Sequence, residues 1–401
     1  MSDFFQPGII STIHRLGNRK LEDMERDLMA FSRTSPVGLV LPALYREFQH
    51  PAMQRIVDEL RGATWLKRIV VAIGRCSHEE YRHARAFFDG YEVPVTSIWM
   101  EDPRVEGLLR DMHNLELTVG GPGKGQTCWL CFGYLLSQAD TAIIALHDCD
   151  IRDYQRDLLA RLVYPLAHPT LSFEFCKGYY ARVSDNKLHG RVTRLFFTPL
   201  IRAVMDLTPE NNYLRFLDSF RYALSGEFAM HADLARVNRI PSDWGLEVGT
   251  LAEVYRNASS SRVCQVDISE NYEHKHQELS PEDASRGLRR MTVDIAKSLF
   301  RSVAQGGHVL TADHFRTLEV FYIRFAQDTI RRFYADAIVN GLDFDQHQED
   351  TAVQVFANSI REAANDYLAD PRGAPQIPNW NRVFSAMNDV QDRLRELANE
   401  P

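Results

Sequence analysis

In the first 150 residues, apolar positions form short continuous runs, separated by segments in which they recur every three or four positions. The continuous runs are residues 37–44, 67–74, 95–100 and 141–146. Runs of this length are typical of buried β-strands. Residues 51–61 and 78–88 lie between them and have the periodicity of amphipathic helices. Strands that alternate with helices predict an α/β fold with a mostly parallel sheet, in which ligands bind beyond the carboxyl ends of the strands.

The pattern divides the chain into three parts: a helical segment at 1–35, an α/β domain at 36–279 and a helical region at 280–401. The first segment carries an apolar face made of Leu21, Met24, Leu28 and Phe31. The α/β domain contains further predicted strands at 171–180 and 262–268 and a predicted helix at 191–205. The last region has only helical periodicity, with helices predicted to start at Ser280 and to cover 313–340, 350–368 and the residues from about 381.

Composition and charge exclude some classes of protein. The chain has 401 residues, 45% of them hydrophobic, which is enough for a full core. Its net charge of −8, with scattered basic residues, argues against nucleic acid as the main partner. It has neither a secretory start nor a run of about 18 apolar residues to span a membrane, so we expect a soluble cytoplasmic protein with reduced cysteines. Cys128 and Cys131 have no second pair with which to form a zinc site and are expected to fill the core.

Two aspartates follow the apolar run at 141–146. Asp148 and Asp150 are one residue apart, at the point where a buried strand is expected to reach solvent. Their hard oxygen atoms suit Mg²⁺ or Mn²⁺, and an ion held there can bridge to a diphosphate such as that of a nucleotide sugar. Considered alone, the two residues also fit an ordinary solvated turn.

Two segments suit anions. Residues 120–125 are glycine-rich and precede a predicted helix, so that backbone amides, the helix N-terminus and Lys124 favour a phosphate group. The spacing is not that of a Walker motif, and a simple turn is the alternative. At a second predicted helix start, Gly190 is followed by Arg191 and Thr193, a set that suits a phosphate or a carboxylate. An ordinary surface helix fits this second segment equally well.

Three further residues are candidate ligands. His274 and His276 follow the last predicted strand, and in an extended loop both rings point the same way, so that either could complete a metal site. Solvated loop histidines are the alternative. Glu247 lies among apolar and glycine residues, where loss of solvent would raise the pKa of its carboxyl and suit it to bind a sugar hydroxyl. An acid that interacts with a helix dipole is the alternative for Glu247.

Seven segments, taken in chain order, resemble motifs of the glucosyl-3-phosphoglycerate synthase family, whose members are retaining glycosyltransferases of the A-type fold. The segments are residues 40–44, 122–125, 148–150, 190–193, 224–228, 244–249 and 265–274. The Gly-Arg-Val-Thr sequence at 190–193 is the most specific of them. The resemblance implies a Rossmann-like nucleotide-sugar sheet with a helical C-terminal appendage, and transfer of glucose from a nucleoside diphosphate glucose (NDP-glucose) to 3-phosphoglycerate.

By this resemblance, each motif has an expected role. The donor nucleotide and its diphosphate are expected at Pro42, Ala43, Leu44, Gly74, Lys124 and Asp148. A divalent metal, Mg²⁺ or Mn²⁺, is expected at Asp148, Asp150 and His274. The acceptor is expected at Gly190, Arg191, Thr193 and His276, the last of which stands where the family usually has Asn. The expected catalytic residues are Leu224 and Glu247, which would position the donor sugar, and Lys124, which would stabilise the leaving diphosphate. Retention of configuration implies attack by the acceptor from the front face, without a protein nucleophile.

Several alternatives stay open. Residues 73–80 replace an Asp/Ser-rich turn that contacts the nucleotide in the family, so the donor base is not fixed. The turn at residues 73–74 and residues 242–245 of this chain are similar to mannosylglycerate synthase, which would use GDP-mannose with glycerate or its phosphate. A non-catalytic nucleotide-sugar-binding protein would bind nucleotide without turnover. A nucleotidyltransferase would need a basic glycine-rich loop after the first strand, where this chain has none. The C-terminal helices are expected to cover the core or to form a homodimer.

Overall fold

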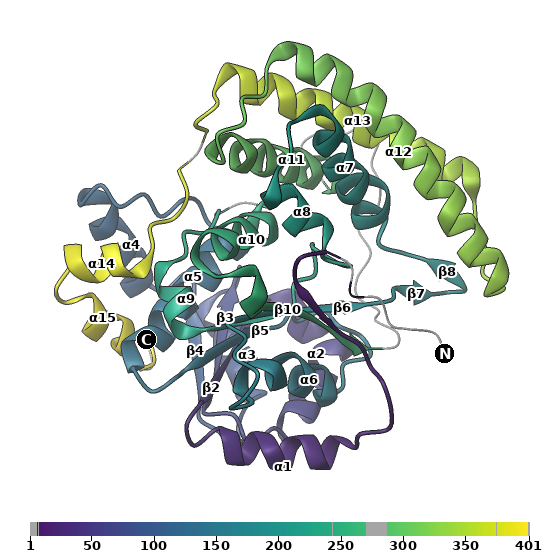
Figure 1. The fold of residues 1–401 in the computed structure, drawn as a ribbon. Helices are drawn as coiled ribbons and strands as arrows, with labels where there is room; N and C mark the ends of the chain where they lie inside the picture. The colour runs from purple at the N-terminus through teal and green to yellow at the C-terminus, as the bar shows by residue number, and fades with distance from the viewer. Residues whose placement is uncertain (1–5, 7, 243, 270–286, 374, 400–401) are drawn as a thin grey trace.

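The computed structural model describes residues 6, 8–242, 244–269, 287–373 and 375–399, in which one sheet of eight strands has helices on both faces (Figure 1). The order of the strands is β1-β10-β6-β9-β5-β2-β3-β4. Their bounds are β1 Ser11–Ile13, β2 Val37–Leu44, β3 Arg68–Gly74, β4 Val95–Trp99, β5 Ile143–Leu146, β6 Phe175–Tyr180, β9 Phe228–His231 and β10 Val263–Ser269. Strand β9 is antiparallel to both neighbours and the other pairs are parallel, which confirms the predicted α/β fold.

Alternate residues of the central strands face two separate cores. In β5, Ile144 faces one core, whereas Ile143 and Ala145 face the other. Because both faces are covered, the strands read as continuous apolar runs in the sequence. One face carries α1 Leu21–Phe31, α2 Pro51–Leu60, α3 His78–Ala86 and α6 Arg156–Ala167. The other carries α4 Pro103–Asn114, α5 Lys124–Gln138, α7 Thr198–Leu207, α8 Asn212–Asp218, α9 Ala232–Val237 and α10 Leu246–Asn257.

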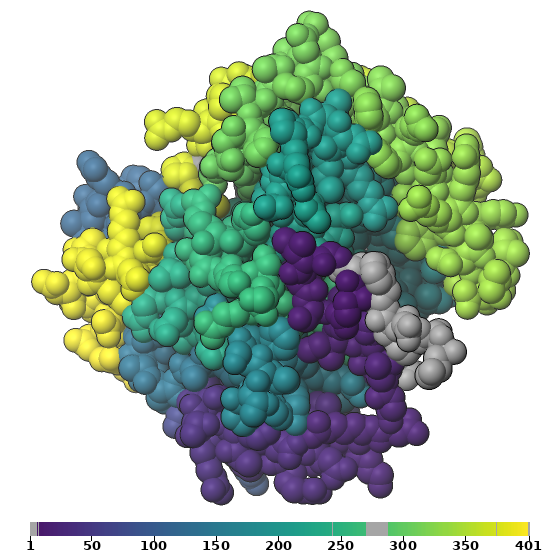
Figure 2. All heavy atoms as spheres, in the orientation of Figure 1, coloured from purple at the N-terminus to yellow at the C-terminus, as the bar shows by residue number. Residues whose placement is uncertain are grey.

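The C-terminal helices pack at two places. Three long helices, α11 Gly287–Gln305, α12 Ala312–Val339 and α13 Gln346–Ala369, pack on one another, and α12 also packs on α7. Two short ones, α14 Trp380–Ala386 and α15 Val390–Glu396, return to α9 and α5 beside the sheet. Figure 2 shows these two groups at opposite sides of one face of the molecule. The division of the chain at about residue 280 stays a prediction.

Two stacked tryptophans join the end of the chain to α5. The rings of Trp129 and Trp380 lie 4.1 Å apart between centroids, and both are buried. The indole Nε1 of Trp129 donates to the carbonyl of Pro378 at 2.8 Å, and that of Trp380 donates to the carbonyl of Trp129 at 3.0 Å. A Cβ atom at Gly133 would lie 2.0 Å from the Trp380 ring, so glycine is required there for this close packing. The last helices are therefore fixed to the helix that begins at Lys124.

Several elements differ from the sequence prediction or lie outside it, and helices α4, α6, α8, α9 and α10 were not predicted. The segment at 1–35 is not wholly helical, because residues 11–13 form β1, which pairs with β10 across 250 residues of chain. Strand β9 was not predicted. The last predicted helix is two helices, α14 and α15. The helix start predicted at Ser280 lies outside the described residues. None of the helices in the described part of the chain is long and apolar enough to cross a membrane.

Candidate active site

Three of the sequence motifs meet at one lysine. Lys124 is the first residue of α5, and its Nζ atom lies 2.6 Å from Oδ1 of Asp148, just beyond the end of β5. The same Nζ lies 3.2 Å from Oε1 of Glu247, in the first turn of α10. Burial opposes the charge of Lys124, but the two carboxylates outweigh it, so the pKa of Lys124 lies well above its ordinary value. The site thus contains a fixed cation at the carboxyl end of the sheet, where ligands of such sheets bind.

Glycines allow the surrounding loops to approach this cation closely. A Cβ atom at Gly125 would lie 2.1 Å from the carbonyl oxygen of Pro241, which leads into the segment that holds Glu247. A Cβ atom at Gly226 would lie 2.2 Å from Oδ2 of Asp148. The motif at 224–228 is therefore packed directly against Asp148. The start of α5, the residues after β5, the motif at 224–228 and the segment from Pro241 to Glu247 are brought together here.

Carboxylates gather around Asp150. The groups that act on its charge are Asp148 beside it, Glu47 from the 3₁₀-helix Tyr45–Gln49 after β2, and the buried Glu227. Burial and the charges of Asp148 and Glu47 raise the pKa of Asp150 to about 7, although Lys124 opposes this effect. The negative charge therefore exceeds what Lys124 offsets, and such a site favours a bound cation.

Buried polar residues that the sequence analysis did not single out support these loops. Lys177 in β6 is 1% exposed, and its Nζ donates to the carbonyl of Ser225 at 2.7 Å. Burial lowers the pKa of Lys177 to about 8. The hydroxyl of Tyr180 donates to Glu227 at 2.8 Å. Lys177 could have been recognised from the sequence as a residue with a buried polar partner, because it lies in the middle of an apolar strand and charged residues are almost never fully buried without a partner.

The predicted nucleotide-binding residues lie at the ends of β2 and β3. The two strands run in parallel register, with Pro42 opposite Ala72 and Leu44 opposite Gly74. The turn after Gly74 is held by Glu101, whose Oε1 accepts from the amide of Arg75 at 2.7 Å. Pro42, Ala43, Leu44 and Gly74 thus end at the same edge of the sheet as Asp148, as their position in the chain predicted.

The predicted acceptor motif forms a turn followed by a π-helix. Gly190 has a φ of +76°, a conformation that favours glycine, and the π-helix Val192–Phe197 follows Arg191. Thr193 is buried. Tyr222 lies beside Gly190 and its ring centroid is 5.0 Å from that of Tyr180, the tyrosine that donates to Glu227. These contacts connect the motif to the acidic cluster, and π-helical turns often occur at functional sites.

Some predicted site residues cannot be placed. His274 and His276 lie outside the described residues, and no group of three or more His, Cys, Asp or Glu side chains in the described part of the chain is arranged to hold a metal ion. Leu224 is partly buried and packs against the core on the α5 side of the sheet. The roles assigned to the site residues by sequence stay predictions.

The burial of His147, next to Asp148, leads to a prediction of how the free energy of unfolding depends on pH. Its ring is fully buried with no hydrogen-bond partner among the described residues, and burial lowers its pKa to about 3. Below pH 6.5 His147 is protonated in the unfolded chain but stays neutral in the folded chain. The free energy of unfolding therefore decreases as the pH falls from about 6.5 towards 3. Between pH 6.5 and 5, we expect the free energy of unfolding of wild type to fall by about 2 kcal/mol more than that of His147→Phe, because one proton contributes about 1.4 kcal/mol per pH unit.

Urea unfolding of both proteins at the two pH values, with chelator present, measures this difference. Phenylalanine keeps the ring and removes the titrating nitrogens. Equal losses in the two proteins would mean that His147 is protonated in the folded protein near its ordinary pKa.

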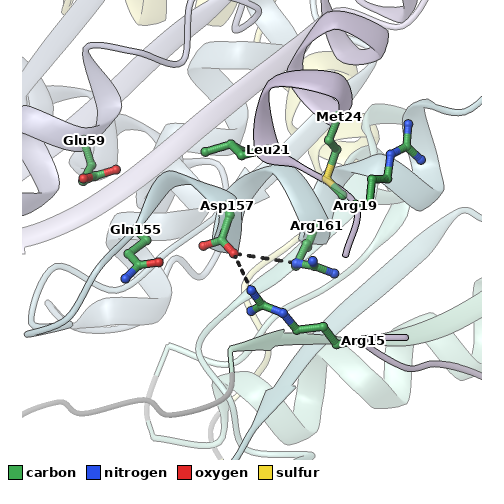
Figure 3. Close-up of a pocket in the computed structure, with 8 residues that line it drawn as sticks. All are labelled: Arg15, Arg19, Leu21, Met24, Glu59, Gln155, Asp157 and Arg161. Atoms are coloured by element: carbon green, nitrogen blue, oxygen red, sulfur yellow. Dashed lines mark ion pairs between the residues drawn. The ribbon is translucent and has the colours of Figure 1, made fainter. Parts of the chain in front are cut away.

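A cavity of about 250 Å³ lies elsewhere, between α1 and α6. It is lined by Arg15, Arg19, Leu21, Met24, Glu59, Gln155, Asp157 and Arg161 (Figure 3). The Asp157 carboxylate lies 3.4 Å from Arg15 and 3.7 Å from Arg161, so these charges compensate one another. None of the predicted site residues lines this cavity.

Known proteins similar to this chain share one name. No family model matches the chain. Glucosyl-3-phosphoglycerate synthase of Persephonella marina (strain DSM 14350 / EX-H1) is 46% identical over 400 residues, which cover 100% of this chain and 99% of that protein. The protein of the same name from Methanococcoides burtonii is 39% identical over 400 residues, covering 98% of this chain and 96% of that protein.

Solved structures show the same fold. Glucosyl-3-phosphoglycerate synthase of Mycobacterium tuberculosis, crystallised with Mn²⁺, UDP-glucose and phosphoglyceric acid, matches with a TM-score of 0.54 at 20% identity, over 76% of this chain and 89% of that chain. A complex of the same enzyme with Mg²⁺ and UDP matches with a TM-score of 0.53 at 19% identity, over 76% of this chain and 89% of that one. The predicted glycosyltransferase fold is therefore confirmed.

Proposed function

The chain belongs to the glucosyl-3-phosphoglycerate synthase family, and we propose that the seven motifs assemble the site that moves glucose from an NDP-glucose to 3-phosphoglycerate. The bond between the anomeric carbon and the diphosphate oxygen breaks. The new bond forms to the C2 oxygen of 3-phosphoglycerate, the one free hydroxyl of that acceptor. With attack from the front face, the hydroxyl proton passes to the leaving diphosphate, and the anomeric configuration is retained.

The observation that carries this proposal is the contact of Lys124 with both Asp148 and Glu247. A fixed ammonium group at the start of α5 lies where the diphosphate of a donor would end, and it stabilises the charge that develops as the sugar leaves. Glu247, held by the same ammonium at 3.2 Å, would accept hydrogen bonds from sugar hydroxyls. Leu224, next to the Ser225 carbonyl that Lys177 holds, would pack against the sugar.

The acidic cluster fits a divalent cation. Asp148 and Asp150 supply hard oxygen donors, and burial together with the charges of Asp148 and Glu47 raises the pKa of Asp150, although Lys124 opposes this effect. We assign these two aspartates as ligands, with His274 as the third predicted ligand. An ion bound there, Mg²⁺ or Mn²⁺, would supply Lewis-acid stabilisation of the diphosphate charge.

The acceptor is assigned to the turn at 190–193. Gly190 forms the turn, with a φ of +76°, and Arg191 supplies a guanidinium that is 27% exposed. The phosphate of 3-phosphoglycerate suits a guanidinium, because two parallel N–H donors match its oxygens. Thr193 is assigned to the same site, with His276 as a further predicted contact.

Product formation with a panel of donors and acceptors tests the function. UDP-, ADP- and GDP-glucose and GDP-mannose would each be supplied with Mg²⁺ and either 3-phosphoglycerate or glycerate. We expect turnover with an NDP-glucose and 3-phosphoglycerate, and the donor that works identifies the base. Turnover only with GDP-mannose and glycerate, or nucleotide binding without turnover, would contradict the proposal.

We also propose a cytoplasmic location and a homodimer. All six cysteines are free thiols and five are buried, which suits a reducing compartment. Light scattering on the purified protein would measure the mass of the assembly against the 46.0 kDa of one chain.

A further inference from the structure

A glutamate of the C-terminal region lies between two arginines of the acceptor motif. Glu349 is in the first turn of α13, and its Oε1 accepts from Nε of Arg191 at 2.7 Å. Its Oε2 accepts from Nη1 of Arg194 at 2.9 Å. The Glu349 side chain is 4% exposed and that of Arg194 is 9% exposed. Because a buried charge is costly unless it is paired, this geometry is strongly determined, unlike that of a surface ion pair.

Arg194 holds Glu349 in place independently of Arg191. Its Nε donates to the carbonyl of His189 at 2.9 Å, and its guanidinium lies over the ring of Phe333 in α12, 4.7 Å from the centroid. Glu349 therefore stays anchored if Arg191 changes its contacts. Oε1 of Glu349, which also accepts from Nη2 of Arg194 at 3.4 Å, is thereby held in the position from which it orients Arg191.

Arg191 is held along one edge of its guanidinium. Nε donates to Glu349, and Nη2 donates to the side chain of Gln348, also on α13. Nη1 has no hydrogen-bond partner in the part of the chain that the structure describes. The partly exposed side chain thus has one edge fixed and one donor available.

The C-terminal helices also fix the backbone of this motif. The hydroxyl of Tyr322 in α12 donates to the carbonyl of Leu195 at 2.8 Å, and Phe356 in α13 packs against Phe196. Both contacts hold the π-helix that follows Arg191. The motif and the C-terminal helices are therefore one packed unit.

We propose that Glu349 is a positioning residue of the acceptor site: it holds Arg191 so that the remaining edge of the guanidinium meets the acceptor phosphate. This inference rests on the proposed function, because it takes Arg191 as the phosphate contact. Because Glu349 lies on α13, this helix would then contribute to recognition of the acceptor. Removal of the Glu349 charge releases Arg191 into several orientations, which weakens acceptor binding and leaves the donor site as it is.

The test compares Glu349→Gln with Glu362→Gln. Glu362 lies on the same helix and pairs with Arg289 at 2.9 Å, away from the acceptor motif, so it is a matched control. For Glu349→Gln we expect KM for 3-phosphoglycerate to rise about tenfold, with kcat and the donor KM changed less than about twofold. For Glu362→Gln we expect all three parameters to change less than about twofold.

A double-mutant cycle separates positioning from a purely structural role. If Glu349 acts through Arg191, then Arg191→Ala/Glu349→Gln has the same acceptor KM as Arg191→Ala alone, within about twofold. An additive rise in KM, an unchanged KM in Glu349→Gln, or equal changes in kcat and both KM values would overturn the proposal. If Glu349→Gln does not fold, Glu349→Asp keeps the charge on a shorter side chain, and an unchanged acceptor KM in that variant overturns the proposal as well. Failure of wild type to turn over any NDP-glucose would instead contradict the proposed function.

Discussion

Replacing Asp150 with alanine is expected to abolish metal-dependent turnover, with a loss in kcat of about 10³-fold or more. The change removes a hard oxygen donor from the site in which Asp148, Glu47 and Glu227 also act on Asp150. Initial rates with saturating substrates and Mg²⁺ measure the loss. Titration with Mn²⁺, followed by the electron paramagnetic resonance signal of the free ion, measures metal binding without relying on activity.

The fold of this variant is expected to remain intact. Asp150 is only partly buried, and its raised pKa means that its charged form is disfavoured in the folded protein. The metal-free variant should therefore melt at the same temperature as wild type or slightly higher. Asp58→Ala, which changes an exposed aspartate on α2, is the control and should retain full activity. Undiminished turnover of wild type in excess chelator would remove the metal from the mechanism.

Replacing Arg191 with alanine is expected to raise the acceptor KM about 10- to 100-fold and to change the donor KM far less. The loss corresponds to a charge-assisted hydrogen bond of about 1.5–3 kcal/mol. The donor is assigned to Lys124 and Asp148, neither of which has a hydrogen bond with Arg191 in the described structure. Initial-rate kinetics with each substrate varied in turn measure the two constants.

A matched control for this variant is Arg316→Ala on α12. Arg316 forms an exposed ion pair with Asp313 at 3.0 Å, and neither constant should change. Equal increases of both KM values in Arg191→Ala would place Arg191 outside the acceptor site. A similar loss with glycerate as the acceptor would show that the arginine does not recognise the phosphate.

Much of the donor half could be predicted because its signals are local. Continuous apolar runs marked β2, β3 and β5, and the motif residues Lys124 and Asp148 follow from what such strand ends and helix starts bind. Their contact at 2.6 Å agrees with the expectation that ligands meet the sheet at this edge. The resemblance to a known family implied that Glu247 belongs to the donor site, and its contact with Lys124 came from the structure.

The parts that sequence did not predict depend on contacts between distant residues. Strand β1 has three residues and becomes a strand only by pairing with β10. Strand β9 has four residues and lies antiparallel between two parallel partners, so its direction depends on the whole sheet. Glu349 occurs in an ordinary acidic first turn of a helix, and its burial against Arg191 and Arg194 is a property of the packed molecule. Periodicity carries no information about such contacts.

The stacked pair of Trp129 and Trp380 has a consequence for synthesis on the ribosome. One face of the helix that begins with Lys124 is covered by α14 and α15, and Trp380 is translated 251 residues after Trp129. Until residue 380 has left the ribosome, Trp129 and Gly133 lack the indole that packs against them in the folded protein. The nascent chain therefore cannot bury Trp129 in this way until residue 380 has been translated, and premature termination before residue 380 leaves this helix without its contact to Trp380.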